Sequence, residues 1–188
     1  MYGTEKFIID ADANIGAFST YAFFKCNPTT KIFALEPVKD TYERLEKTIN
    51  DNHLENGIAT RNYGVGSISQ EKAIFISSVG TYSSSYFKAS ENTEVIIIHN
   101  LKEVLNDIQA PDTVDLLKMD CEGAEMEALL GAEIETLRRF HRIALEYHEF
   151  AGFKITDVSN HLSRAGFREE KNIFFPLYKS GPAEYIRF

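Results

Sequence analysis

Residues 7–18 read FIIDADANIGAF and carry the signals that decide the fold. Phe7–Asp10 is a short apolar run typical of a buried strand, and it ends in an acidic residue. From Asn14 to Lys25, apolar residues recur at helical spacing. Gly16 lies in the turn between them, where glycine lets a ligand approach the backbone, although an ordinary tight turn also uses glycine. The stretch predicts a strand, a turn and a helix whose N-terminus attracts negative groups.

The same alternation of apolar runs and helical patterns continues along the chain. Further strands are expected at Ile32–Leu35, Val95–His99, Val114–Met119 and Ile143–Glu146, and helices at residues 40–49, 101–108, 121–130 and 156–165. Gly57–Ile76 alternates more and contains Gly64 and Gly66, so it is predicted as a hairpin. Nearly continuous apolar strands favour a parallel sheet that helices cover on both faces.

The C-terminal region departs from this parallel pattern. Ile173–Leu177 and Tyr185–Phe188 are expected strands, joined by Lys179–Pro182. That connection is too short for a parallel crossover, so these two strands should form an antiparallel hairpin at one edge. The sequence therefore predicts one α/β domain over residues 1–188, with a doubly wound, mostly parallel sheet and an antiparallel C-terminal hairpin.

Composition limits the classes of partner. The 188 residues include 20 Lys and Arg against 28 Asp and Glu, a net charge of −8. Nucleic-acid binding needs clustered basic residues, and the longest basic run is Arg138–Arg139, so no nucleic-acid partner is expected.

Cys26 and Cys121 are too few for a disulfide framework, which favours a reducing compartment. Because no apolar segment is long enough to span a bilayer and Met1–Lys6 does not resemble a signal peptide, we expect a cytoplasmic protein without a membrane partner.

An acidic residue follows the second expected strand. In doubly wound sheets, ligands bind at the carboxyl ends of the strands, where the strand order reverses. Glu36 lies there, about 20 residues after Gly16, and a carboxylate at this spacing accepts hydrogen bonds from both hydroxyls of a ribose. A solvated carboxylate at a strand end is the alternative. Together with the first turn, Glu36 favours a nicotinamide cofactor or S-adenosylmethionine, and the missing G-x-G-x-x-G argues against a dinucleotide.

More acidic residues follow the strand at residues 114–119. Asp120, Glu122 and Glu125 lie at a strand-to-helix junction in the stretch LKMDCEGAE. Glu122 and Glu125 suit the first turn of a helix, where the helix dipole stabilises anions, so helix capping is the simpler explanation. His148 closes the next strand and adds a titratable side chain at the same edge, although a lone histidine is more often structural.

In sequence and order, these motifs resemble those of the FkbM-type methyltransferases. Asp10–Gly16 is similar to the family's D-x-G-A-N-x-G motif, and Ala34–Pro37 is similar to its acidic-Pro motif. Leu116–Glu125, followed by Gly131–Ala132, resembles the most distinctive stretch of the family. The resemblance therefore covers every strand end that the sequence marks as a ligand site.

The resemblance extends from about Phe7 to Gly166. Leu145–His148 is similar to a late strand of the family, and Gly80–Ser84 is similar to its Gly-Ser loop. Membership implies a Rossmann-like fold of the class I methyltransferase type. It also implies S-adenosylmethionine as cofactor and methyl transfer to a hydroxyl of a sugar or small metabolite as the reaction.

The resemblance also implies roles for individual residues. Asp10, Asn14 and Gly16 would hold the methionine part of the cofactor. Glu36 would hold the ribose. Asp120 would lie near the amino end of the cofactor or near the reacting methyl group.

Two features depart from the family pattern. Asp12 stands where the family has its first glycine, inside the cofactor-binding motif. Aspartate tolerates a left-handed backbone better than most residues, so we expect the turn to survive. Its carboxylate projects where backbone and cofactor should touch, which predicts an open or weakened pocket. Other members carry extra N-terminal structure that often helps to cover the site, whereas this sequence starts almost at the first strand.

Methyl transfer requires alignment of the acceptor with the methyl group and, for a hydroxyl acceptor, a group that takes its proton. Asp120, Glu122 and His148 are the candidate bases, and the sequence does not rank them. Their spacing has no strong metal signature, so no metal is expected, although a metal-assisted variant would use the same residues.

Two alternative functions remain. The first is a non-catalytic binding module in which Asp12 weakens the cofactor site. The second is a nicotinamide-dependent oxidoreductase that uses Glu36.

Overall fold

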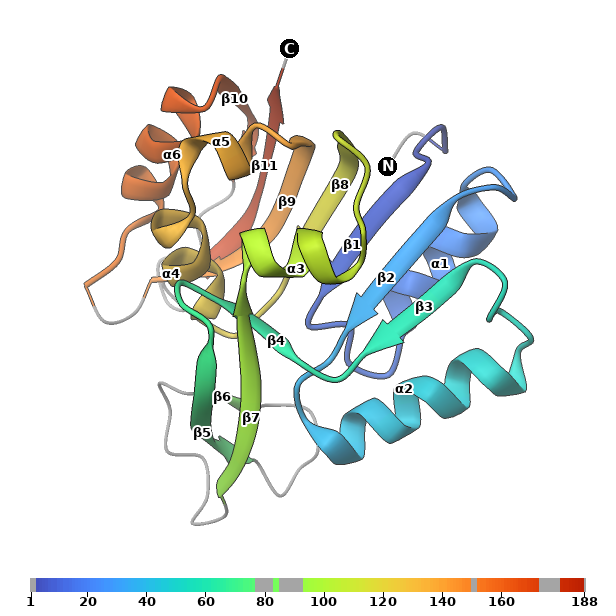
Figure 1. Ribbon diagram of the computed structural model, residues 1–188. Helices are drawn as coiled ribbons and strands as arrows, with labels where there is room; N and C mark the ends of the chain where they lie inside the picture. Colours follow the sequence, from blue (N-terminus) through green and yellow to red (C-terminus); the bar gives the residue numbers. More distant parts are fainter. Residues whose placement is uncertain (1–2, 77–82, 85–92, 150–151, 173–179, 188) are drawn as a thin grey trace.

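The chain forms one main sheet and one small sheet, with helices around them (Figure 1). The computed structural model describes residues 3–76, 83–84, 93–149, 152–172 and 180–187. The strands are β1 (Phe7–Ala11), β2 (Lys31–Leu35), β3 (Ile58–Arg61), β4 (Gly64–Gly66), β5 (Gln70–Ile76), β6 (Ser83–Ser84), β7 (Thr93–Asn100), β8 (Val114–Met119), β9 (Phe140–His148), β10 (Phe167–Asn172) and β11 (Ser180–Arg187). The helices are α1 (Ala17–Lys25), α2 (Lys39–Asp51), α3 (Leu101–Asp107), α4 (Ala124–Gly131), α5 (Ile134–Leu137) and α6 (Ile155–Arg164). Among the helices of the described residues, none is long and apolar enough to cross a membrane.

The main sheet confirms the predicted doubly wound, mostly parallel architecture. Its strand order is β10-β11-β9-β8-β1-β2-β3, and β9, β8, β1, β2 and β3 run parallel. The chain moves from β1 to β3 on one side and resumes at β8 on the other side of β1. The strand order therefore reverses between β1 and β8, where Asp10 pairs with Lys118. Ligands of doubly wound proteins bind at the carboxyl end of such a reversal.

The antiparallel C-terminal end is also confirmed, but its strands lie at other residues than predicted. β11 is antiparallel to both β9 and β10. β10 begins at Phe167, ahead of the predicted strand Ile173–Leu177, which lies outside the described residues. Ser180–Pro182, predicted as part of a turn, belongs to β11 and pairs with Glu146–His148 of β9. Pairing of β11 on both sides overrides the local turn signal of its Gly-Pro sequence.

The prediction of a hairpin over Gly57–Ile76 is wrong. β3 joins the main sheet beside β2, whereas β4 and β5 lie on opposite sides of β7 in the small sheet, whose order is β4-β7-β5-β6. Gly64 and Gly66 serve close packing instead of a turn. A Cβ atom at Gly66 would lie 2.7 Å from Cγ2 of Ile98 on β7, a distance that real Cβ atoms do not show.

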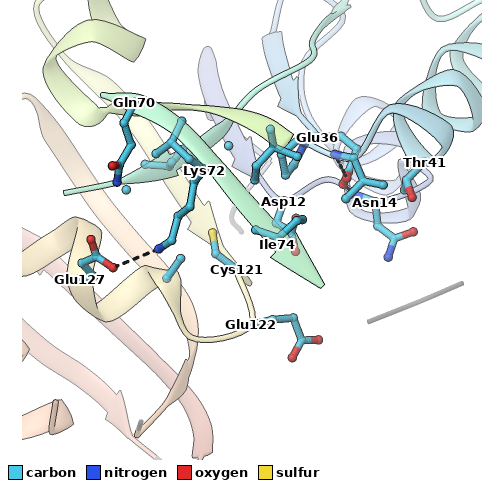
Figure 2. Close-up of a pocket in the computed structure, with 18 residues that line it drawn as sticks. Asp12, Asn14, Glu36, Thr41, Gln70, Lys72, Ile74, Cys121, Glu122 and Glu127 are labelled. Atoms are coloured by element: carbon cyan, nitrogen blue, oxygen red, sulfur yellow. Dashed lines mark hydrogen bonds and ion pairs between the residues drawn. The ribbon is translucent and has the colours of Figure 1, made fainter. Parts of the chain in front are cut away.

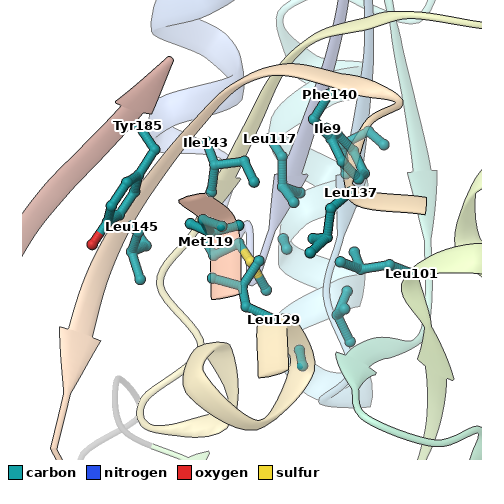
Figure 3. Close-up of a cluster of buried hydrophobic side chains, with 14 of the residues drawn as sticks. Ile9, Leu101, Leu117, Met119, Leu129, Leu137, Phe140, Ile143, Leu145 and Tyr185 are labelled. Carbon is teal, nitrogen blue, oxygen red and sulfur yellow. The ribbon is translucent and has the colours of Figure 1, made fainter. Parts of the chain in front are cut away.

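Buried hydrophobic side chains fill both sides of the main sheet at its centre. Ile9 belongs to a cluster with residues of α3 to α6, drawn in Figure 3, and Ile8 belongs to a second cluster with residues of α1 and α2. Toward the β10 end of the sheet, by contrast, Glu146 of β9 and its β11 partner Pro182 are exposed. The predicted cover by helices on both faces holds at β1, while β9 and β11 keep exposed side chains.

Candidate functional site

A pocket opens between the carboxyl ends of β1, β2 and β8 and the small sheet (Figure 2). The lining residues come from three parts of the chain. They are Asp12, Asn14, Glu36, Pro37 and Val38 from the loops after β1 and β2, with Thr41 from α2; Gly64, Val65, Gly66, Gln70, Lys72, Ile74, Ile96 and Ile98 from the small sheet; and Cys121, Glu122, Ala124 and Glu127 from the turn after β8 and from α4. The pocket lies at the reversal of strand order, where a doubly wound sheet binds its ligands.

Glu36 is the fixed acidic group of this pocket. The side chain is only 3% exposed, and it lies on the pocket lining at the end of β2. Its Oε2 accepts a hydrogen bond from the backbone N–H of Asn14 at 3.0 Å, and Oε1 accepts one from Val38 at 2.9 Å. Burial raises the pKa of Glu36 to about 7 in spite of these two bonds. Because each carboxylate oxygen accepts two hydrogen bonds, Glu36 retains the capacity to accept from ligand hydroxyls.

The turn between β1 and α1 contains three left-handed residues. The φ angles are 63° at Asp12, 52° at Asn14 and 89° at Gly16. The prediction that aspartate at position 12 permits this backbone is therefore confirmed. Burial and the charge of Glu36 raise the pKa of Asp12 well above its usual value. Nζ of Lys118 donates to the carbonyl oxygen of Asp12 at 3.1 Å, which ties the turn to β8.

Asp10 and Gly16 support the turn from outside the pocket lining. Asp10 is fully buried, accepts a hydrogen bond from Ser19 Oγ at 2.7 Å and forms an ion pair with Lys118 at 3.1 Å. A Cβ atom at Gly16 would lie 2.8 Å from Cδ1 of Leu45, so the close approach of α1 and α2 favours glycine there. These contacts assign Asp10 and Gly16 to the shape of the turn, and direct contact with the methionine part of a cofactor stays a prediction.

The three candidate bases do not gather at one point. Glu122 lines the pocket, and Nε2 of His148 lies 3.8 Å from its Oε2. Asp120 lines a separate pocket on the strands β8, β9 and β11, which Glu146 also lines. In the described part of the chain, no group of three His, Cys, Asp or Glu side chains is placed to hold a metal ion. The structure therefore brings Glu122 and His148 together. Asp120, on the lining of the other pocket, lies near enough for its charge to add to burial in raising the pKa values of Glu122 and Asp12. The role of each candidate as a base stays a prediction.

His148 is held by Glu125, one of the three carboxylates that the sequence places at the strand-to-helix junction, with helix capping as the alternative. Glu125 Oε1 accepts a hydrogen bond from the backbone N–H of His148 at 2.8 Å and lies 3.1 Å from its Nδ1. Burial by itself lowers the pKa of His148, but the hydrogen bond and charge of Glu125, together with Glu122 and Glu146, outweigh burial and raise it. His148 therefore retains its proton to a higher pH than a free histidine.

Two contributions to the site were missed at the level of sequence. Lys118 supports the first turn, and the signal for it was a lysine inside the apolar strand LLKM, because a buried ammonium needs a charged or polar partner. Lys72, Ile74 and Ile96 from the small sheet form part of the pocket wall. No local pattern indicates their position, since they reach the pocket through the pairing of β5 with β7.

The chain matches a known family over most of its length. Residues 10–169 match the sequence profile of the Methyltransferase FkbM domain. The chain belongs to the FkbM methyltransferase family. The matched region includes every residue on the pocket lining, from Asp12 to Glu127. The resemblance inferred from the motifs is therefore confirmed.

Among curated proteins, the chain is 26% identical to the methyltransferase SdnD of Sordaria araneosa, over 80% of this chain and 70% of that relative. It is 28% identical to the hexuronic acid methyltransferase AglP of Haloferax volcanii, over 86% of this chain and 63% of that relative. The chain thus covers about two-thirds of the length of each relative.

Two solved structures show the same fold. The methyltransferase FkbM of Methylobacillus flagellatus superposes with a TM-score of 0.64 at 18% identity, over 98% of this chain and 44% of that chain. Fibrillarin of Aeropyrum pernix, with natively bound S-adenosylmethionine, superposes with a TM-score of 0.61 at 10% identity, over 99% of this chain and 69% of that chain. The predicted Rossmann-like fold of class I methyltransferases is therefore confirmed.

Proposed function

We propose that the protein transfers a methyl group from S-adenosylmethionine to a hydroxyl oxygen of a sugar or another small metabolite. The observation that carries this proposal is the buried carboxylate of Glu36, fixed on the pocket lining by the N–H groups of Asn14 and Val38. A carboxylate at the end of the second strand, beside the turn that follows the first, suits the ribose of an adenosine ligand. Family membership supports methyl transfer as the reaction.

Residues around the pocket suit the separate parts of S-adenosylmethionine. Glu36 would hold the ribose hydroxyls, and the left-handed turn at Asp12 and Asn14 would hold the methionine part. Val38 and Ile74 belong to a buried apolar cluster on the pocket wall, which suits the flat face of the adenine. Fibrillarin of Aeropyrum pernix, which has the same fold, contains natively bound S-adenosylmethionine and supports this choice of cofactor.

The charge of the pocket supports a cationic cofactor. Asp12, Glu36, Glu122 and Glu127 line it, with Lys72 as the basic residue on the described lining. S-adenosylmethionine carries a positive sulfonium, which the product S-adenosylhomocysteine lacks. Carboxylates near a sulfonium stabilise its charge, and the sulfonium in turn favours their ionised forms. The lining therefore favours the methyl donor over the spent cofactor.

The pocket end opposite Glu36 supports a hydroxylated acceptor. Figure 2 shows Gln70 and Lys72 of β5 at that end, close to Glu127 of α4. Nζ of Lys72 lies 3.7 Å from Oε2 of Glu127. An amide, an ammonium and a carboxylate offer both donors and acceptors, as several sugar hydroxyls require. The relative AglP is a hexuronic acid methyltransferase, which supports the sugar class.

In this reaction the cofactor supplies a methyl group that its sulfonium already activates for displacement. The protein aligns the acceptor oxygen with that group and takes the hydroxyl proton. Among the three candidate bases, Glu122 lies on the pocket lining, and Nε2 of His148 lies 3.8 Å from its Oε2. These two residues are therefore better placed to take the proton than Asp120.

A transfer assay tests the proposal. The protein is incubated with S-adenosylmethionine and a panel of neutral sugars, uronic acids and small hydroxylated metabolites, and the products are analysed by mass spectrometry. We expect an O-methylated product and an equal amount of S-adenosylhomocysteine from at least one acceptor. Transfer to nitrogen or carbon only would contradict the proposed hydroxyl acceptor.

A further inference from the structure

Glu125 makes more contacts than capping of α4 requires. Its side chain is fully buried. Oε2 accepts a hydrogen bond from the backbone N–H of Gly123 at 2.9 Å. Oε1 accepts one from the backbone N–H of His148 at 2.8 Å and lies 3.1 Å from Nδ1 of the same residue. One carboxylate thus ties the turn after β8 to the end of β9.

These contacts determine which nitrogen of His148 carries the proton. Both oxygens of Glu125 already accept from backbone N–H groups, so the carboxylate acts as an acceptor toward Nδ1 as well. Nδ1 must then be the donor, and in the neutral ring Nε2 is the basic nitrogen. Nε2 is also the nitrogen nearest to Glu122, at 3.8 Å from its Oε2.

The same carboxylate holds the turn that carries Glu122. The backbone N–H of Ala124 donates to the carbonyl of Cys121 at 3.0 Å, and Glu122 and Gly123 between them have φ angles of 47° and 107°. A left-handed glutamate is uncommon and persists only where its surroundings hold it. The bond from Gly123 to Glu125 provides such a restraint, so Glu125 fixes both the backbone of Glu122 and the ring of His148.

We propose that Glu125 is a positioning residue, which sets Glu122 and His148 as the pair that takes the proton of the acceptor hydroxyl. This proposal rests on the proposed function. As the acceptor oxygen forms its bond to the methyl carbon, the carbon–sulfur bond breaks and its electron pair stays on sulfur. The hydroxyl proton passes to the carboxylate of Glu122 on the pocket lining, and Nε2 of His148, 3.8 Å from Oε2, accepts it when the two side chains close to hydrogen-bond distance. His148 releases it to solvent after the product has left.

The charges around His148 fit this role. Glu125 from α4, Glu122 from the preceding turn and Glu146 from β9 face the ring, and together they overcome burial and raise the pKa of His148. Burial raises the pKa of Glu122, although the charge of His148 opposes this. Because Glu125 makes the hydrogen bond to His148, its replacement by glutamine should lower the pKa of His148. This change in pKa tests the contact, and a matching shift in the pH dependence of the rate tests the positioning role.

Nuclear magnetic resonance tests the proposal without an acceptor. In the wild-type protein, ¹⁵N shifts at high pH should show His148 protonated at Nδ1. In Glu125→Gln, a ring titration should give a lower pKa for His148. Glu133→Gln, which removes an exposed carboxylate at the start of α5, should leave that pKa unchanged. With a methyl acceptor, Glu125→Gln should lose about 10²-fold in turnover at unchanged cofactor affinity, and the rise of its rate with pH should move to lower pH.

An Nε2-protonated ring in the wild type, or an unchanged pKa of His148 in folded Glu125→Gln, would overturn the proposal. If Glu125→Gln does not fold, the tautomer of the wild-type ring decides the question. Failure of the proposed function is distinguishable, because it appears as the absence of O-methyl transfer by the wild type and does not affect the titration.

Discussion

The backbone N–H of Asn14 donates to Oε2 of Glu36 at 3.0 Å, so the turn after β1 is bonded to the side chain that ends β2. The two motifs that indicate an adenosine ligand are thus one connected structure. Val38 holds the second oxygen of Glu36, which fixes the carboxylate before any ligand binds. A fixed carboxylate loses little side-chain entropy on binding, so this connection favours affinity.

The raised pKa of Glu36 predicts a dependence of stability on pH. Burial raises it from the usual 4.5 to about 7, so between these values the folded state binds the proton more tightly than the unfolded state. The free energy of unfolding should therefore fall as the pH rises from about 4.5 to about 7, by up to about 3 kcal/mol from this residue. Urea denaturation across this range measures it. Glu36→Gln should show a flatter dependence, and an equal slope in both proteins would exclude Glu36 as the source.

Asp12→Gly should tighten cofactor binding. At φ 63°, glycine adopts the backbone of Asp12 without steric cost, and it removes a side chain from the pocket lining. Burial and the charge of Glu36 raise the pKa of Asp12, so glycine also removes a group whose charged form the site disfavours. The effect should appear in calorimetry even though glycine adds entropy to the unfolded chain. Weaker binding in Asp12→Gly would show that Asp12 itself contacts the cofactor, for example its ammonium group.

Lys118→Met should destabilise the fold. The substitution keeps an extended side chain but leaves the buried carboxylate of Asp10 without its ion pair. Loss of one partner of a buried pair costs about 3–5 kcal/mol, which urea denaturation detects. The double variant Asp10→Asn with Lys118→Met should regain part of this loss, because it no longer buries a charge. Equal losses in the single and double variants would contradict the pairing.

The three candidate bases should differ in a transfer assay. Glu122→Gln and His148→Ala should each lose about 10²–10⁴-fold in turnover at similar cofactor affinity. Asp120→Asn should stay within a few-fold of the wild type, because Asp120 lines a different pocket. With His148 neutral in the active form, the wild-type rate should rise with pH through a value above the usual 6.5, as the raised pKa of His148 requires. If all three variants retain turnover within a few-fold, alignment alone carries the reaction.

The sequence predicts the parts of this fold that local patterns encode. The strand at Val114–Met119 appears at the predicted bounds, and the turn at Asp10–Gly16 has the left-handed backbone that its Asp, Asn and Gly residues permit. The small sheet is different, because β4 and β5 reach β7 across long stretches of chain. Its glycines suggested a hairpin because a glycine that permits close packing looks the same in sequence as a glycine that permits a turn.

In the candidate site, too, the sequence predicts the residues that follow strand ends but not the contacts that depend on packing. Glu36, Asn14 and Glu122 follow strand ends, and the parallel sheet brings strand ends to one edge, so their presence at the pocket was predictable. The contact between Glu125 and His148 was not, because it depends on the packing of α4 against β9. The position of Asp120 outside this pocket depends likewise on packing that the sequence pattern does not show.

Isothermal titration calorimetry with S-adenosylmethionine tests the central claim most directly, because it measures the pocket without knowledge of the acceptor. The wild type should bind one equivalent, and Glu36→Ala should weaken binding by about 1.5–3 kcal/mol, the scale of hydrogen bonds to a charged group. Glu55→Ala, an exposed carboxylate change elsewhere, is the matched control and should bind as the wild type does. Absence of binding to the wild type, or unchanged affinity in folded Glu36→Ala, would contradict the assignment of this pocket to S-adenosylmethionine.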